Sequence, residues 1–213
     1  MDSATTFIFQ LAILIFSVVI HEVSHGLAAN ALGDPTAKYA GRLTLNPFKH
    51  LDPIGSFFVP LLGFLFGGII IGWAKPVPYN PYNLQVRNKD AGSALVGAAG
   101  PLANIFIAVI FGFLVRISAV WTQGLGEAAI SLVEIMGAIV FINLALAVFN
   151  LVPIPPLDGS KVLFSLLPYQ WQGLKAILEQ FGFILLLIFI FYFSHWILPA
   201  VLFMFRFITG VNP

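Results

Sequence analysis

The chain has 213 residues, of which 59% are apolar and only 9% are charged, and its mean hydropathy is +0.96. A soluble domain carries about a quarter charged residues, so this composition excludes an ordinary water-soluble globular protein. It predicts an all-α polytopic membrane protein with one domain over residues 1–213 and a core at residues 4–165. The net charge of +1 without a basic cluster argues against nucleic acid as a partner. The chain has no cysteine, which excludes disulfides and thiolate metal sites.

The first apolar stretch runs from Thr6 to Ile20, and helical character is expected to continue to Leu32. Gly33-Asp34-Pro35 follows, and this turn chemistry predicts that the helix ends there with Gly33 as its C-cap. The N-terminal residues before this stretch lack the positive region of a signal peptide, so we expect them to be retained.

The end of this stretch carries the motif His21-Glu22-Val23-Ser24-His25. On a helix the two histidines are four residues apart and share one face, which is the spacing at which both can hold one zinc ion. Glu22 projects from nearly the same face, where a carboxylate can accept a proton from a water that zinc activates. Two histidines and a carboxylate at membrane depth are costly, so their presence indicates a functional site.

The region between the first helix and the next one is irregular. The alternating pattern from Arg42 to Leu45 predicts a short strand. The segment Ile54 to Trp73 is apolar but broken by proline and glycine, so it either crosses the membrane or enters it and returns. The prolines of the following stretch, Gly72 to Pro78, forbid a helix and leave an edge strand or a polyproline conformation.

Three more apolar stretches follow this region. Ala94 to Arg116 and Ile130 to Val152 each predict a membrane helix, and the first of them begins with a face of small residues, Gly97 to Asn104, suited to close helix packing. Residues 177–208 predict one long tilted span or two short ones. Together these segments predict a bundle of about five to six membrane segments, with short membrane-associated strands before the Ala94 helix.

A catalytic zinc site needs a third protein ligand and one open position. Asp158 is the best candidate, because it follows a proline-broken membrane helix and precedes a glycine at which the backbone can approach closely. We interpret Glu134 as an interfacial carboxylate, because it lies at the opposite end of its helix, near Glu127. We interpret His195 as an interfacial or packed residue, because its segment is otherwise apolar and without features. We interpret His50 as a loop histidine and Asp52 as a turn cap.

The basic residues predict the orientation in the membrane. If residues 54–73 enter the membrane and return to the same side, eight of the ten basic residues collect on one face of the membrane. The positive-inside rule then places the N-terminus outside and the histidine motif toward the cytoplasm. The eight residues are Lys38, Arg42, Lys49, Lys75, Arg87, Lys89, Lys161 and Lys175.

Three motifs together resemble the site-2 protease family of intramembrane zinc metalloproteases. They are the His21–His25 motif, the small-residue run Gly97 to Asn104, and the run Asn150 to Gly159, which reads NLVPIPPLDG. Within this family the chain is most similar to the compact bacterial branch, whose members have no PDZ domain. In that branch the runs GRLTLNP and GWAKPVPYNP lie between the histidine motif and the LDG motif. The resemblance covers about Val19 to Lys161 and does not extend to the C-terminal apolar region.

The resemblance implies that His21, His25 and Asp158 hold one Zn²⁺ per chain, and that Glu22 is the general base. It implies that Asn150 helps to position the substrate backbone or the oxyanion, and that Asn104, a second polar group near the site, also faces the substrate or the oxyanion. It also implies a stretch that pairs with unwound substrate, because an edge strand can replace main-chain hydrogen bonds where water is scarce. This stretch is Gly72, Trp73, Ala74, Lys75, Pro76 and Val77.

The predicted function is hydrolysis of peptide bonds within or near transmembrane segments of membrane proteins, in the bacterial cell membrane. The expected partners are a transmembrane protein substrate and the lipid bilayer, and an accessory membrane protein or a homo-oligomer stays open. One alternative is a metal-ion channel or transporter, but a conduit needs no base between its histidines, and no inverted repeat is evident. The other is a catalytically silent scaffold of the same fold that binds helices.

Overall fold

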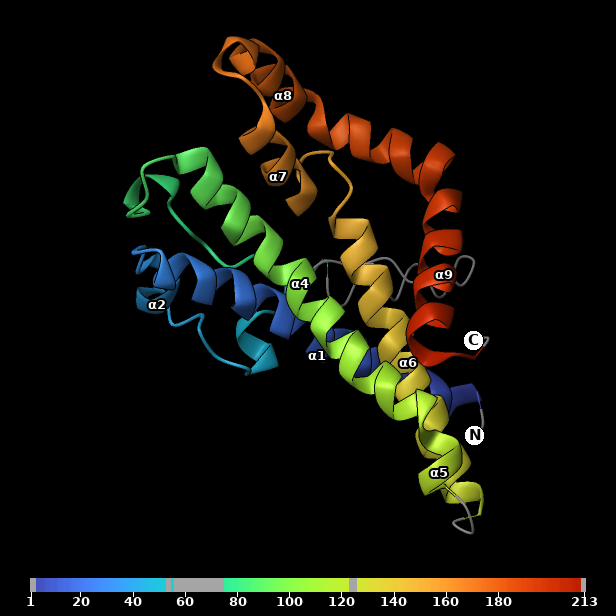
Figure 1. Cartoon of the computed structure of the whole chain (residues 1–213). Helices are drawn as coiled ribbons and strands as arrows, with labels where there is room; N and C mark the ends of the chain where they lie inside the picture. Colours follow the sequence, from blue (N-terminus) through green and yellow to red (C-terminus); the bar gives the residue numbers. More distant parts are fainter. Residues whose placement is uncertain (1–2, 53–54, 56–74, 123–125, 212–213) are drawn as a thin grey trace.

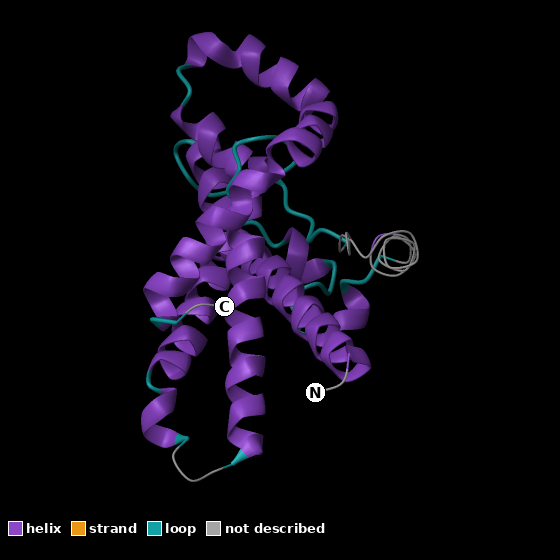
Figure 2. Ribbon diagram, turned by 90° about the vertical axis from the view of Figure 1, so that its right-hand side faces the viewer, coloured by secondary structure: helices purple, strands orange, loops and turns teal. Residues whose placement is uncertain are grey.

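The computed structural model describes residues 3–52, 55, 75–122 and 126–211. Within these residues the chain consists of helices and loops, with no strand (Figure 2). Four of the described stretches are long and apolar enough to cross a membrane, namely Thr5–Ala31, Lys89–Arg116, Glu127–Asn150 and Gln172–Thr209. The all-α polytopic membrane class is therefore confirmed, while the predicted segment 54–73 lies, except for Gly55, outside the described residues.

The α-helices are α1 (Ser3–Ala31), α2 (Thr36–Tyr39), α4 (Lys89–Arg116), α5 (Ser118–Trp121), α6 (Glu127–Asn150), α7 (Asp158–Leu166), α8 (Gln172–Ile188) and α9 (Ile197–Thr209). Single turns of 3₁₀ helix are η1 (Pro47–Lys49), η3 (Pro81–Asn83), η4 (Tyr169–Trp171) and η6 (Ser194–Trp196), and η5 (Phe189–Phe193) is a π-helical turn.

Helix α1 ends at the predicted turn. Gly33 has a φ of +98°, a conformation that glycine adopts without steric cost, and the Asp34 N–H donates back to the carbonyl of Ala29 at 2.9 Å. The buried Asp34 carboxylate accepts from the Asn80 N–H at 2.6 Å and from the Thr36 hydroxyl. Burial by itself raises the pKa of this carboxyl. The hydrogen bonds lower the pKa by more than burial raises it, so it lies below its ordinary value. Asp34 thus ties the end of α1 to the segment before α4.

Helices α1, α4 and α6 form the centre of the molecule (Figure 1). Helix α4 starts at Asn88, whose side chain accepts from the N–H groups of Asp90 and Ala91, a typical N-cap. The predicted small-residue face of α4 is buried, which lets the neighbouring helices approach closely. A hydrophobic cluster joins α4, α6 and α9 beside it, formed by Ala108, Val140, Leu144, Val201 and Phe205.

The C-terminal apolar region is one helical stretch that changes direction. Helix α8 runs past the end of the bundle near α7, and the chain then turns through η5 and η6 into α9, which packs on the bundle (Figure 1). Arg116 at the end of α4 donates to the carbonyl of Phe207 in α9 at 3.2 Å. Only α9 therefore returns through the bundle, and its 13 residues rise about 20 Å, less than the hydrocarbon thickness.

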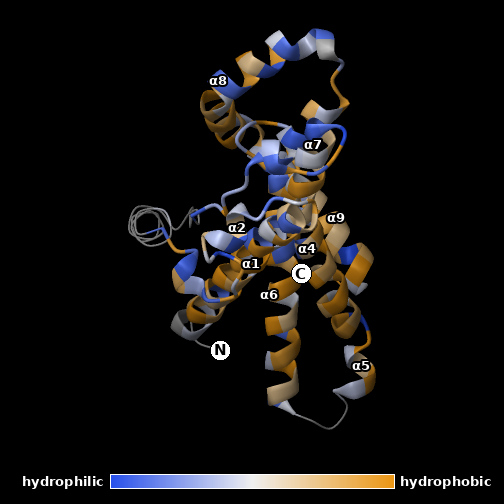
Figure 3. Ribbon diagram, turned by 90° about the vertical axis from the view of Figure 1, so that its left-hand side faces the viewer, coloured by the Kyte–Doolittle hydropathy of each residue, from blue (hydrophilic) through white to orange (hydrophobic). Residues whose placement is uncertain are grey.

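Hydrophilic residues gather around α7 and the loops on either side of α2, whereas α6 and α9 are mostly hydrophobic (Figure 3). The strand predicted at Arg42 to Leu45 is wrong, since these residues form bends and irregular chain. Its alternation has another cause, because the Arg42 side chain is buried and donates to the carbonyl of Lys75 at 2.5 Å. The arginine therefore joins two loops instead of facing solvent from a strand.

Candidate metal centre

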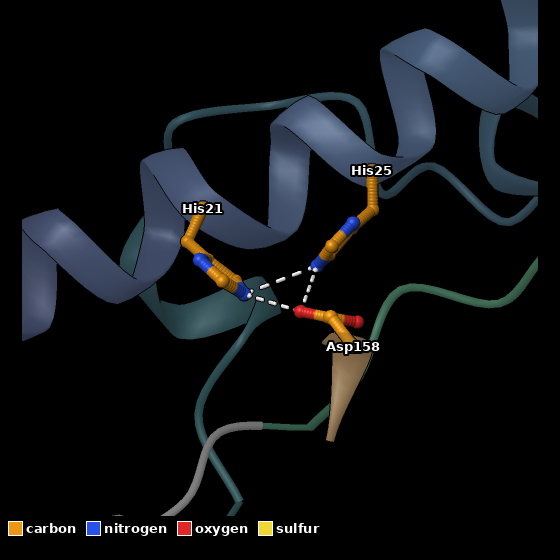
Figure 4. A group of neighbouring side chains, drawn as sticks. All are labelled: His21, His25 and Asp158. Carbon is orange, nitrogen blue, oxygen red and sulfur yellow. Dashed lines mark hydrogen bonds and ion pairs between the residues drawn. The ribbon is translucent and has the colours of Figure 1, made fainter. Parts of the chain in front are cut away.

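Three side chains meet between α1 and the first residue of α7 (Figure 4). Asp158 Oδ2 lies 3.1 Å from His21 Nε2 and 3.0 Å from His25 Nε2, and the two nitrogens are 3.0 Å apart. Ligand atoms about 2.0–2.1 Å from one tetrahedral zinc ion lie about 3.3 Å from each other. All three residues are buried, and their ligand atoms form a group of a size that could hold one metal ion.

The other nitrogen of each imidazole has a partner that fixes its proton. His25 Nδ1 lies 2.7 Å from the carbonyl oxygen of Val96, which can only accept, so Nδ1 donates. His21 Nδ1 donates in the same way to Asn104 Oδ1 at 2.6 Å. In the neutral ring both Nε2 atoms then present lone pairs toward the Asp158 oxygen. Such a cluster of electron-rich atoms is stabilised by a shared cation, and the donor set of two nitrogens and one oxygen suits zinc.

A buried chain of hydrogen bonds holds Asn104 in place. Its Nδ2 donates to Asn143 Oδ1 at 2.8 Å, and Asn143 Nδ2 donates to Ser17 Oγ at 2.9 Å. Asn104 is completely buried. In this structure it therefore orients His21, whereas the resemblance suggested a group that faces the substrate or the oxyanion. Asn143 thus joins neighbouring helices, as asparagines in membrane helices commonly do. The role of Ser17 was missed in the sequence, where the only signal was a polar residue on an apolar helix.

Gly100 of α4 gives the imidazoles their space. A Cβ atom at this position would lie 2.5 Å from His25 Nε2 and 2.7 Å from His21 Cε1. Only a residue without a side chain fits at this distance, so the small-residue face of α4 serves the metal group as well as helix packing.

Asp158 reaches the histidines from a loop that follows α6. The close backbone approach expected next to it is present, because a Cβ on Gly159 would lie 2.6 Å from the carbonyl oxygen of Val152. The second carboxylate oxygen, Oδ1, accepts from Lys161 Nζ at 2.9 Å. Burial lowers the pKa of Lys161, but the attraction of the Asp158 carboxylate raises it above its ordinary value, so the ammonium form is kept.

Glu22 is held by the main chain of an extended segment. Its Oε2 accepts from the Val77 N–H at 2.8 Å. One turn further along α1, Gly26 lets this segment approach, since a Cβ there would lie 2.9 Å from Val77 Cγ1. The Lys75 N–H donates to the His50 carbonyl at 2.9 Å, and the Lys75 carbonyl accepts from Arg42. The main-chain groups of Lys75 and Val77 are thus already hydrogen-bonded within the chain.

The other sequence candidates lie apart from this group. Asn150 is at the end of α6, where its Nδ2 donates to the Leu146 carbonyl of its own helix at 2.9 Å. Glu134 faces an apolar cavity of about 590 Å³ that Gln10 of α1 also lines. His195 is exposed beside Trp196.

The remaining candidates from the sequence are two loop residues, His50 and Asp52, and the expected substrate strand. His50 is buried and its Nε2 donates to the Thr44 carbonyl at 2.8 Å, while Asp52 caps the Gly55 N–H at 2.7 Å. Both therefore serve the loop, as interpreted from the sequence. The first half of the expected substrate strand, Gly72, Trp73 and Ala74, lies outside the described residues.

Fold and site together define a helical membrane protein with a buried His–His–Asp group suited to a metal ion. The model of peptidase family M50 matches residues 117–189, which include Asp158. The chain is 38% identical over 176 residues to a Bacillus subtilis protein named "Putative zinc metalloprotease YwhC", an alignment that covers 82% of this chain and 76% of that protein. The chain belongs to peptidase family M50, the family of the site-2 proteases.

Further relatives carry similar names. The chain is 32% identical over 183 residues to "Putative zinc metalloprotease Rip2" of Mycolicibacterium smegmatis, covering 85% of this chain and 66% of that protein. It is 30% identical over 190 residues to the Rip2 protein of Mycobacterium tuberculosis, covering 87% of this chain and 67% of that protein. No solved structure gives a significant match. Family membership places the chain among the zinc metalloproteases.

Proposed function

We propose that this protein is an intramembrane zinc endopeptidase that cuts membrane proteins within or near their transmembrane segments. The observation that carries this proposal is the meeting of His21, His25 and Asp158 around one point, with Glu22 on the same helix as the histidine pair. Bound zinc supplies a Lewis acid that lowers the pKa of a water molecule and polarises a carbonyl oxygen. The group lies in a helix bundle whose spans are apolar, which suits a substrate delivered from the lipid.

Glu22 acts as the proton carrier in this mechanism. It accepts a proton from the attacking water as the new C–O bond forms, and it gives that proton to the nitrogen when the C–N bond breaks. The hydrogen bond from Val77 holds one carboxylate oxygen in place at 2.8 Å. Asn104 and the Val96 carbonyl keep the two histidines in the orientation that leaves their Nε2 atoms unprotonated.

Substrate handling is assigned to the end of α6 and to the extended segment before η3. Asn150 lies at the end of α6, just before the loop that leads to Asp158, and its amide is proposed to bind the substrate main chain or the oxyanion. An unwound substrate strand that pairs with the segment 72–77 would compete with Glu22 for the Val77 N–H. Substrate binding would then release the base that cleavage requires.

The mechanism is tested by replacing Glu22. Glu22→Gln is expected to keep the fold and the zinc and to abolish cleavage of a membrane-embedded test substrate, because an amide cannot accept the proton. The matched control is Glu134→Gln, the same change at a carboxylate that faces an apolar cavity elsewhere in the bundle, and it should cleave like the wild type. Undiminished cleavage by Glu22→Gln would rule out this mechanism, and an inactive wild type would favour the helix-binding scaffold.

We also propose that the histidine end of α1 faces the cytoplasm. Contacts of Lys75 with His50 and Arg42 bring the loops on either side of residues 54–73 together. Because the chain has no cysteine, Lys49→Cys and Lys75→Cys give clean labelling sites, and both should react from the same side of the membrane. Arg206→Cys in the last turn of α9 should react from the other side. Labelling of the two lysine positions from opposite sides would refute the prediction that residues 54–73 enter the membrane and return, and labelling of both from the outer side would refute the orientation.

A further inference from the structure

The two oxygens of Asp158 face different partners. Oδ2 is directed at the histidine pair, at 3.0 Å and 3.1 Å, whereas Oδ1 accepts from the ammonium group of Lys161 at 2.9 Å. Both residues belong to α7, three positions apart, so their side chains lie on one face of the helix. The carboxylate is therefore held between the histidines on one side and a fixed cation on the other.

Three separate contacts fix Lys161. Its stem packs against Gly97 of α4, where a Cβ atom would lie 2.8 Å from Lys161 Cδ. Its ammonium lies over the ring of Tyr79, 5.4 Å from the ring centre, in a cation–π contact. Asp158 provides the third contact. A long charged side chain can turn toward water without such contacts. These three contacts therefore distinguish Lys161 from an ordinary surface lysine.

The orientation of the carboxylate decides how many positions around a metal it fills. A carboxylate with two free oxygens can bind a metal through one oxygen or through both. A catalytic zinc site needs three protein ligands and one open position, so binding through both oxygens would fill the place that the reaction uses. A charge-assisted hydrogen bond to one oxygen is strong enough to keep that oxygen from binding the metal.

We propose that Lys161 is a positioning residue which holds Asp158 Oδ1 away from the metal, so that Asp158 ligates through Oδ2 alone and one coordination position stays open. This inference rests on the proposed zinc site. Lys161 does not touch the substrate or the reacting atoms in this scheme. It acts only through Asp158, in the way that hydrogen-bond partners of metal ligands act in other sites.

A neighbouring lysine provides a matched control. Lys161 and Lys175 line the same cavity of about 460 Å³ between α4, α7 and α8. Lys175 also pairs with a carboxylate, Asp90 Oδ1 at 2.8 Å, and its ammonium lies 5.5 Å from the centre of the Phe164 ring. Its contacts are thus of the same kind as those of Lys161, but Asp90 is not in the metal group.

The test compares metal binding in the full-length purified protein. Lys161→Met keeps the stem against Gly97 and removes the ammonium, and we expect zinc affinity, measured by competition with a chelator, to rise about 10-fold, because the freed oxygen adds a ligand and a positive charge beside the metal is lost. With Co²⁺ in place of zinc, the visible absorption of Lys161→Met should weaken, because a second carboxylate oxygen raises the coordination number. Lys161→Arg should restore both values, and Lys175→Met should match the wild type in both.

Two outcomes would overturn the proposal. A Lys161→Met protein with wild-type zinc affinity and an unchanged Co²⁺ spectrum removes the role of Lys161 but leaves the zinc site standing. A wild-type protein that binds neither metal overturns the zinc site and this inference together. If Lys161→Met does not fold, Lys161→Gln takes its place with the same expected changes, because it also keeps part of the stem and lacks the charge.

Discussion

The two sides of the metal group are built in different ways. The histidines lie on a long helix inside the bundle, and their free nitrogens are bound by a buried amide and a helix carbonyl. Asp158 comes from a short helix after an irregular loop, and a partly exposed lysine binds its second oxygen. The histidine side is fixed by helix packing, and the carboxylate side is fixed by loop geometry and charge. Changes on the two sides should therefore differ in both size and kind.

The largest effect is expected from the carboxylate itself. Asp158→Ala removes one of three ligands, so zinc affinity should fall more than about 100-fold, beyond the loss typical of an outer partner. Competition with a chelator measures the affinity, and elemental analysis measures how much zinc stays with the purified protein. The helix bundle should stay folded, because Asp158 lies outside the cluster that joins α4, α6 and α9. Zinc content equal to that of the wild type would remove Asp158 from the ligand set.

The histidine side can be tested by filling the space that Gly100 leaves for the two imidazole rings. Gly100→Ala places a methyl group 2.5 Å from His25 Nε2 and 2.7 Å from His21 Cε1, so both rings must move. We expect zinc affinity to drop about 10- to 100-fold, as when an outer partner of a ligand is lost. Gly137→Ala is the control, because this glycine also lies in a membrane helix and a Cβ there would meet only Phe205 Cζ, at 4.0 Å. Equal zinc binding by both variants would contradict the packing described for Gly100.

A smaller effect is expected from the amide that orients His21. Asn104→Leu keeps the branched shape of the side chain and removes the acceptor for His21 Nδ1, so zinc affinity should fall about tenfold, at the low end for such partners. Asn150→Leu should instead keep its zinc and slow cleavage, since the Asn150 amide is assigned to substrate. If Asn104→Leu slows cleavage with unchanged zinc affinity, Asn104 serves the substrate, as the resemblance suggested.

Much of the fold could be predicted from the sequence because apolar length and turn chemistry are local signals. The end of α1 at Gly33 and the membrane helix that ends at Arg116 follow from them. The spacing of the histidine motif predicted that His21 and His25 share one helix face, and the structure brings Asp158 to them. The strand at Arg42 failed because alternation cannot distinguish a sheet from a buried arginine that joins two loops.

The partners of the site residues could not be predicted in the same way. That Asn104 binds His21 depends on the relative rotation of α1 and α4, which no local pattern specifies. The link between Lys161 and Asp158 is local, three residues apart, but its importance depends on which carboxylate oxygen faces the histidines. The bend between α8 and α9 could not be predicted because both stretches are similarly apolar. It depends on the packing of α9 on the bundle.

Two of the four central side chains are held by backbone atoms, His25 by the carbonyl of Val96 and Glu22 by the N–H of Val77. Random substitution at either valine changes the side chain and leaves that peptide group in place. Only a proline at position 77 would delete the donor outright, because proline has no N–H. A change of side chain at these two positions therefore acts on the site only through packing, since the hydrogen bonds to His25 and Glu22 need only the peptide groups.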